Sequence, residues 1–291
     1  MFDDLICVDW SAAAAPRTGA DSIWVAATSC SDDGQPDLRN IATRRGTFDA
    51  LFDDLSDAVA AGRRVLCGFD FPLGYPATFA DRAGLGGDGA PWKRLWRYLA
   101  AAIADEADNA NNRFAVATDL NRRLGQLVFW GCPSGAASAW LPMRKPRPWP
   151  DTLAEFRLCE RRAPGRPQPV WKLAYSGSVG SQALTGIPVL ARLRQMPALA
   201  PYTRIWPFET AELDWAALPR PLLVIAEVYP SLFDSEAEDH PVKDARQVRA
   251  ACRALNELQT DGRMVQALSL AGLSGSERRA VIEEEAWILG V

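Results

Sequence analysis

Residues 5–11 read Leu-Ile-Cys-Val-Asp-Trp-Ser, and residues 65–72 read Val-Leu-Cys-Gly-Phe-Asp-Phe-Pro. Each is a run of apolar or small residues typical of a buried strand, and each ends in one acid, Asp9 or Asp70. Residues 222–230, Leu-Leu-Val-Ile-Ala-Glu-Val-Tyr-Pro, repeat the pattern with Glu227. A carboxylate at a buried strand is costly unless its charge is compensated. The three acids therefore predict one shared cationic partner, and a divalent metal is the simplest candidate.

The composition is that of an ordinary globular protein. The chain has 291 residues, 48% apolar and 23% charged, with a net charge of -4. This charge provides no general attraction to nucleic acid or to an anionic membrane, although a local basic patch is compatible with it. The acidic N-terminus is unlike a signal peptide, and no apolar run approaches the roughly 20 residues that span a bilayer. We expect a cytoplasmic protein with no membrane partner.

Cysteine and histidine usage narrows the chemistry. The six cysteines are scattered without a Cys-x-x-Cys pair, which favours neither a zinc site nor a disulfide framework, and Cys7 and Cys67 are expected in the core. The one histidine, His240, excludes a His-rich metal site, and no Gly-x-Ser-x-Gly motif accompanies it. Acid–base or metal chemistry must therefore depend mainly on carboxylates, which suit Mg²⁺ or Mn²⁺ and the hydrolysis of phosphodiesters.

The order of elements indicates a single α/β domain. The patterns predict strands over 5–10, 23–28 and 38–43, then a helix over 47–61 with Thr47 as N-cap and Gly62 at its end, then a strand over 65–69. Further helices are expected over 91–107, 113–127, 187–195, 242–258, 262–271 and 276–285, and the last strand over 222–226. Residues 1–75 and 222–291 would form the core, and residues 76–221 a large, mostly helical and loop insertion between the fourth and last core strands.

Other candidate site residues carry weaker signals. Near the C-terminus, Asp244 could complete the acid cluster or only favour a helix dipole, and Asp261 could complete it or only cap a helix. Ser11 follows the first acid, and three cations are candidate phosphate contacts, namely Lys172, Lys243 and Arg246. The glycine- and serine-rich residues 176–186 could cradle a phosphate through backbone N–H groups, although they match no phosphate-loop motif. Tryptophans such as Trp92 and Trp96 are expected to pack in the core rather than stack on bases.

Several of these motifs resemble a known family. Val-Asp-Trp-Ser on the first strand, Gly-Phe-Asp-Phe-Pro-Leu-Gly after the fourth, Glu-Val-Tyr-Pro on a late strand and Glu-Glu-Ala-Trp-Ile-Leu-Gly near the end resemble the predicted RNase H-like nucleases, a domain-of-unknown-function family. The resemblance covers roughly residues 5–75 and 222–290, and the order of three strands, a helix and a strand also matches the RNase H-like fold. It implies a mixed sheet flanked by helices, with Asp9, Asp70 and Glu227 as catalytic acids and metal ligands. Spacing favours Asp261 as the last acid, whereas the Lys-Asp-Ala-Arg-Gln-Val stretch favours Asp244, with Lys243 resembling a family lysine.

Three functions follow as alternatives. The leading expectation is a Mg²⁺- or Mn²⁺-dependent nuclease that hydrolyses a nucleic acid or a nucleotide. The second is a phosphotransferase or ATPase-like protein that binds Mg-nucleotide. The third is a non-catalytic RNase H-like binding module. Acids gathered within reach of one ion favour an enzyme, whereas dispersed acids, each paired with an arginine, favour the module.

Overall fold

The described part of the chain forms one mixed sheet of six strands. This is seen in a computed structural model that describes residues 1–31, 34–165, 167–211 and 213–291. The strands are β1 (Asp4–Asp9), β2 (Ile23–Ser29), β3 (Asp37–Ile41), β4 (Arg64–Phe69), β5 (Thr203–Ile205) and β6 (Leu222–Glu227). Their order is β3-β2-β1-β4-β6-β5. Strand β2 runs antiparallel to β1 and β3, whereas β4, β6 and β5 continue parallel to β1.

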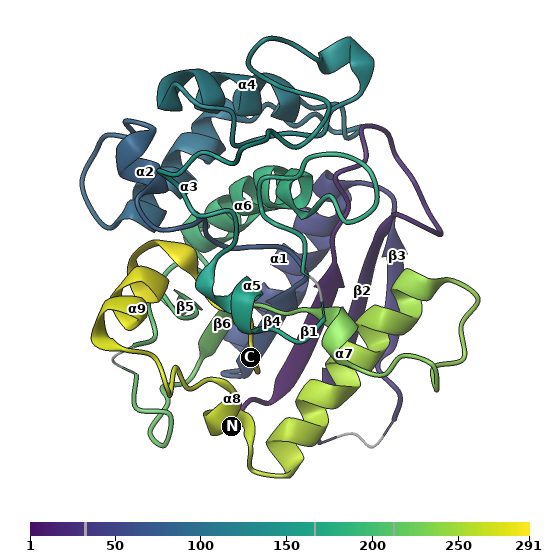
Figure 1. Ribbon diagram of the computed structural model, residues 1–291. Helices are drawn as coiled ribbons and strands as arrows, with labels where there is room; N and C mark the ends of the chain where they lie inside the picture. Colours follow the sequence, from purple (N-terminus) through teal and green to yellow (C-terminus); the bar gives the residue numbers. More distant parts are fainter. Residues whose placement is uncertain (32–33, 166, 212) are drawn as a thin grey trace.

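Helices cover both faces of the sheet, as Figure 1 shows for α7 on one face and α1 on the other. The helices are α1 (Arg44–Ala60), α2 (Phe79–Arg82), α3 (Pro91–Ala102), α4 (Arg113–Leu124), α5 (Leu158–Arg162), α6 (Val179–Gln195), α7 (Lys243–Thr260), α8 (Met264–Ala267) and α9 (Gly275–Ala280). Short 3-10 turns occupy Ser134–Ala136 and Pro230–Leu232, and a π-helical turn occupies Val281–Glu285. The predicted α/β class, a mixed sheet flanked by helices, is confirmed. No helix within the described ranges has the length and apolarity needed to cross a membrane.

Alternation along the strands divides the core between the two faces. Ile6 and Val8 of β1 pack with α1 and α6, whereas Leu5 and Cys7 pack with α7. Cys7 and Cys67 are buried, as predicted from the apolar runs around them. Because successive side chains of a strand point to opposite faces, this division also determines which acids at the strand ends can meet.

The opening of the chain has the predicted order of three strands, a helix and a strand. The cap of α1 differs from the prediction. Thr43 is the N-cap, and its hydroxyl accepts the Gly46 N–H, whereas Thr47 lies inside the helix and donates to the Thr43 carbonyl. The helix therefore begins one turn earlier than expected. It ends at the predicted place, since Gly62 follows it with a left-handed φ of 65°.

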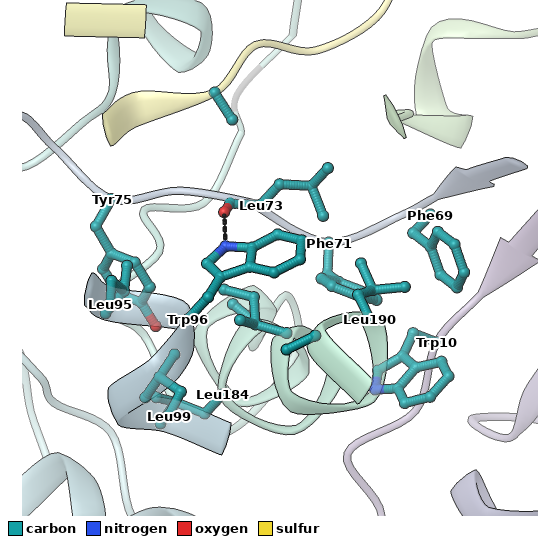
Figure 2. Packing of buried hydrophobic residues seen from close by; sticks show 14 of the residues in the cluster. Trp10, Phe69, Phe71, Leu73, Tyr75, Leu95, Trp96, Leu99, Leu184 and Leu190 are labelled. Atoms are coloured by element: carbon teal, nitrogen blue, oxygen red, sulfur yellow. Dashed lines mark hydrogen bonds between the residues drawn. The ribbon is translucent and has the colours of Figure 1, made fainter. Parts of the chain in front are cut away.

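The glycine-rich residues 176–186 are mostly helical, so α6 begins before the helix expected over 187–195. Helix α6 begins at Val179 and includes Gly180 and Gly186. A Cβ at Gly186 would lie 2.2 Å from the ring of Phe71, and one at Gly180 would lie 2.2 Å from the Val170 carbonyl oxygen. These glycines permit close packing of α6. Figure 2 shows Phe71 among the aromatic and leucine side chains that fill the space between the sheet end, α3 and α6.

Residues 76–221 contribute to the sheet and to the hydrophobic core. They supply edge strand β5, which the sequence did not predict, and α6, whose Leu184 and Ile187 share one hydrophobic cluster with β1 and β4. The short helices α2 and α5 were also not predicted.

Two further expectations have different outcomes. The helix expected over 262–271 is shorter and is reduced to α8, Met264–Ala267. The tryptophans Trp92 and Trp96 are buried, and the Trp96 indole donates to the Leu73 carbonyl (Figure 2).

The packing of α6 generates a stability prediction. Alanine normally stabilises a helix interior relative to glycine by roughly 0.5–1 kcal/mol. Gly186→Ala should instead lower the free energy of unfolding by about 1–3 kcal/mol, because the new methyl group would overlap the Phe71 ring. Urea denaturation measures this. The control is Gly275→Ala, where a Cβ meets nothing within 4 Å. A stabilised Gly186→Ala variant would contradict the packing described for α6.

Candidate functional site

Strand register places Asp9 beside Asp70. The β1–β4 ladder pairs Val8 with Phe69, and the Asp70 N–H continues it by donating to the Val8 carbonyl at 3.1 Å. One step farther, Asp9 and Asp70 are neighbours. Asp9 is two residues from Cys7 in β1, so both side chains point to the same face of the sheet, which is covered by α7. Laterally paired residues also share a face, so the Asp70 carboxylate points to this face as well. The two strand-end acids are thus brought together as the sequence predicted.

Asp70 is held firmly in place. One carboxylate oxygen accepts the Trp10 N–H at 2.7 Å, and the other accepts the Gln182 side-chain amide at 3.3 Å. Gln182 also donates to the Trp10 carbonyl at 2.5 Å. The Trp10 indole donates to Thr185 of α6 at 3.1 Å and packs on Phe71 (Figure 2). The end of β1, the end of β4 and the first turns of α6 therefore form one rigid unit.

The surroundings of the two carboxyl groups disfavour their charged forms. Burial raises the pKa of Asp9 well above its ordinary value, and Asp70 and Asp244 raise it further. Burial likewise raises the pKa of Asp70 to about 7; Asp244 adds to the increase, whereas the bonds from Trp10 and Gln182 oppose it. A hydrogen bond between the Asp9 and Asp70 carboxyl groups also raises the pKa of Asp9. Perturbed acids of this kind, close together at a sheet edge, are characteristic of functional sites.

Asp244 rather than Asp261 lies near this pair. Asp244 is in the first turn of α7, and one of its oxygens accepts the Asp21 N–H at 2.7 Å. Asp261 follows the other end of α7, is exposed, and pairs with Arg263 at 2.8 Å. At 1.5 Å per residue the two acids are separated by about 25 Å along the helix. Of the two candidates for the last acid, only Asp244 can contribute to a site with Asp9 and Asp70.

Glu227 points away from the pair. It is registered with Phe69, so it lies on the opposite face of the sheet from Asp9 and Asp70. Arg157 donates to both of its carboxylate oxygens, at 2.7 and 2.6 Å, and the Leu73 N–H donates at 3.2 Å. Its cationic partner is therefore an arginine instead of a metal shared with Asp9 and Asp70. Arg157 is itself buried and also bonds Glu160 at 2.8 Å.

A cavity of about 920 Å³, which we call the Asp9 cavity, opens at this edge of the sheet. Its acids come from Asp9, Asp21, Asp70 and Asp244, and its cations are Arg17 and Arg113. Ser11 lines it as predicted, with its hydroxyl donating to the Asp21 carbonyl at 2.9 Å. The first turn of α6 and residues 173–178 form another part of its wall. Part of the glycine- and serine-rich stretch thus borders the acids, although mainly as a helix start.

The three predicted phosphate-binding cations do not line the Asp9 cavity. Lys172 donates to the Ser176 carbonyl at 2.5 Å and to Gln168 at 3.1 Å. Arg246 donates to the His240 carbonyl at 3.2 Å, and Lys243 is exposed on the first turn of α7. The cation that sequence reasoning missed is Arg113, at the start of α4. Nothing in its local sequence signals a site, since only the tertiary fold brings α4 over the end of β1.

The donor set fits a hard cation in part. Among the described residues, no group of three or more His, Cys, Asp and Glu side chains is arranged to hold a metal ion. Magnesium commonly takes only one or two protein carboxylates, with waters and substrate phosphate as the other ligands. Asp9 and Asp70 supply such a pair of oxygen donors, and a cation would relieve their repulsion. Comparison of the chain with family models, curated proteins and solved structures found no match in any of the three.

The Glu227 ion pair predicts a large effect on folding. Arg157→Met should lower the free energy of unfolding by about 3–5 kcal/mol, because Glu227 and Glu160 would stay buried without their cation. The matched control is Arg45→Met, which removes an exposed pair with Asp49 and should cost less than about 1 kcal/mol. Urea denaturation of both variants compares them. Equal losses would show that the buried pair contributes no more than a surface one.

The raised pKa of Asp70 predicts a pH dependence. Its stabilising contribution is complete below the ordinary pKa of 3.8 and is lost as the pH rises through the folded value of about 7. The metal-free protein should therefore lose stability over this range. Asp70→Asn should reduce the loss and be more stable than the wild type at pH 8 by roughly 1–3 kcal/mol.

Urea denaturation in EDTA at several pH values provides the measurement. Part of the decline should persist in the variant, because burial also raises the pKa of Glu284 to about 7. Asp261→Asn is the control and should follow the wild type at every pH. Parallel curves for Asp70→Asn and wild type would contradict the charge repulsion at the site.

Proposed function

We propose that the chain is a Mg²⁺- or Mn²⁺-dependent RNase H-like nuclease that hydrolyses phosphodiester bonds in a nucleic acid or nucleotide. One observation carries the proposal: Asp9, Asp70 and Asp244 line one open cavity at the carboxyl edge of parallel strands. Open α/β sheets place ligands at this edge. The order of three strands, a helix and a strand supports the RNase H-like assignment, and so does the position of Asp9 and Asp70 at the ends of neighbouring strands.

The acids have different environments, which suits different roles. Asp70 is fixed by Trp10 and Gln182, so its carboxylate offers oxygens in a defined position. Asp9 and Asp70 together would hold the cation, and Asp244 faces them from α7 with one oxygen bonded to the Asp21 N–H. The cation, when bound, would activate water and stabilise the charge that develops on the phosphate. Asp244 would orient the attacking water or a water ligand of the cation.

The distribution of partners favours an enzyme over a non-catalytic module. Glu227 and Glu160 share Arg157, as acids of a structural framework would. Asp9, Asp70 and Asp244 have no arginine or lysine within ion-pair distance among the residues described. A purely structural role does not account for three acids that line one cavity without a cationic side chain paired to any of them. The phosphotransferase alternative would use the same acids and differ in the acceptor of the phosphoryl group.

Metal binding tests the shared site. Calorimetric titration with Mn²⁺ should show binding to the wild type and at least about hundredfold weaker binding to the double variant Asp9→Asn, Asp70→Asn. Changes to residues that only hydrogen-bond a metal ligand already cost roughly 10–100-fold. Asp244→Asn should weaken binding less. Asp261→Asn removes an acid from the far end of α7 and should bind like the wild type. Unchanged Mn²⁺ affinity in the double variant would refute the site.

Activity tests the reaction. Purified protein should cleave labelled single-stranded DNA, RNA or a dinucleotide in Mn²⁺, and EDTA should abolish the cleavage. The same variants should lose activity in the order in which they lose Mn²⁺ binding. Phosphoryl transfer from ATP without phosphodiester cleavage would favour the phosphotransferase instead. Metal binding with neither reaction would refute the proposed nuclease.

A further inference from the structure

Arg113 is a partly buried cation without a carboxylate partner. Its Nε donates to Ser181 at 2.9 Å, one terminal nitrogen donates to Asn111 at 2.8 Å, and its guanidinium carbon lies 4.4 Å from the Phe114 ring centroid. Within the described part of the chain, no Asp or Glu lies within ion-pair distance of it. The other terminal nitrogen makes no hydrogen bond with a described residue. A guanidinium has five N–H donors, so this one retains capacity for a ligand.

The nearest candidate counter-ion is already engaged. Asp105 accepts two hydrogen bonds from Arg44, at 2.7 and 2.6 Å. Asp105 is therefore already paired with Arg44. Burial and repulsion from Arg44 together lower the pKa of Arg113 to about 10, although Asp105 opposes the decrease. An unpaired cation in a partly desolvated place is costly unless an anion joins it.

Arg113 lies on the Asp9 cavity, together with the start of α6. Ser176, Gly177 and Ser178 line this wall, and α6 is 17 residues long, so its N-terminal dipole adds to the positive potential of Arg113. Ser178 makes no side-chain cap bond. The Asp9 cavity therefore has acids on one part of its lining, Asp9 and Asp70, and groups that attract anions on another part, Arg113 and the N-terminus of α6.

Tyr175 adds an aromatic surface to the same wall. It is 63% exposed, which is unusual for a side chain of its size, and it is a non-glycine residue with φ of 69°. Its hydroxyl donates to the Cys132 carbonyl at 3.3 Å, so the ring is tethered at its far end. An exposed, tethered ring beside a cationic wall has the properties of a stacking platform for a nucleobase.

We propose that Arg113 and Tyr175 form a nucleotide subsite of the Asp9 cavity, in which Arg113 binds a phosphate and Tyr175 stacks on the attached base. The inference rests on the proposed function and narrows its substrate to unpaired nucleotides, at a strand end or in single-stranded nucleic acid. A base within a duplex has both faces stacked and offers none to Tyr175. Arg113 suits phosphate because its planar fork can donate two hydrogen bonds to phosphate oxygens.

The test separates this subsite from the acids. The double variant Asp9→Asn, Asp70→Asn lacks the proposed metal ligands and their repulsion toward anions, so it is the background for calorimetry in EDTA. The probes are adenosine 5′-monophosphate, ribose 5-phosphate and inorganic phosphate. In this background adenosine 5′-monophosphate should bind more tightly than the other two probes. Arg113→Gln should weaken the binding of this nucleotide about tenfold to hundredfold. Arg113→Lys should retain part of the affinity, because it keeps the charge but loses the fork.

Tyr175 distinguishes a nucleotide from a bare phosphate. Tyr175→Ala should weaken the binding of adenosine 5′-monophosphate at least about fivefold and leave the binding of inorganic phosphate unchanged. Tyr175→Phe keeps the ring and loses only the bond to the Cys132 carbonyl, so it should lose less nucleotide affinity than Tyr175→Ala. Arg45→Gln on the exposed face of α1 is the control for loss of charge. Melting temperatures of all variants verify folding.

Three results would overturn the subsite. The first is that the background protein shows no detectable nucleotide binding, and the second is that Arg113→Gln leaves the nucleotide affinity unchanged. The third is that Tyr175→Ala lowers the affinities for nucleotide and for inorganic phosphate equally. The nuclease proposal fails in a different way: the wild type would then bind no Mn²⁺ or would cleave no substrate. Nucleotide binding that depends on Arg113 and Tyr175 would then still identify a nucleotide-binding protein.

Discussion

The repulsion between Asp9 and Asp70 is the constraint around which this edge of the sheet is organised. The pairing of β1 with β4 makes the two carboxylates neighbours, and burial prevents water from screening them fully. The Trp10 N–H and Gln182 relieve part of the charge on Asp70, and a proton relieves another part. What remains is negative potential directed into an open cavity. A bound cation would remove this potential without any change in the backbone.

Alternation along the strands explains why the acids separate into two groups. Asp9 and Asp70 point toward α7, whereas Glu227 points to the other face and meets Arg157. Near that ion pair, Glu284 and Glu285 accept backbone N–H groups of Ala77, Thr78 and Ala80, in the segment that leads from β4 into α2. The Leu73 N–H bonds Glu227. These acids therefore hold the segment that follows Asp70, and they act on the site through the position of that segment.

The sequence alone was sufficient for the strand-end acids and insufficient for their partners. Apolar runs predicted β1, β4 and β6, and two acids that end neighbouring parallel strands must lie close together. Glu227 was misplaced because a run of six buried residues has no alternation from which to infer its face. Asp244 and Asp261 were indistinguishable because the direction of α7 across the sheet is a tertiary property. Gly186 was considered only as part of a stretch that could cradle a phosphate, whereas the structure shows that close contact with Phe71 requires a glycine there. Arg113 carried no signal because its role depends on where α4 packs.

Hydrogen bonds from two buried side chains fix the walls of the Asp9 cavity. Arg44 donates to the carbonyls of Ser11 and Ala13, at 3.0 and 2.8 Å, and so fastens the β1–β2 loop to α1. Asn109 donates to the Ala15 carbonyl at 3.2 Å and fastens the same loop at a second point. Arg44 also binds Asp105, which leaves Arg113 without an acidic partner. One buried arginine thus fixes a wall of the cavity and occupies the acid that could otherwise pair with Arg113. Because these groups are fixed before a ligand arrives, a phosphate between the acids and Arg113 would meet charges that need no reorganisation, which is the condition for strong electrostatic stabilisation.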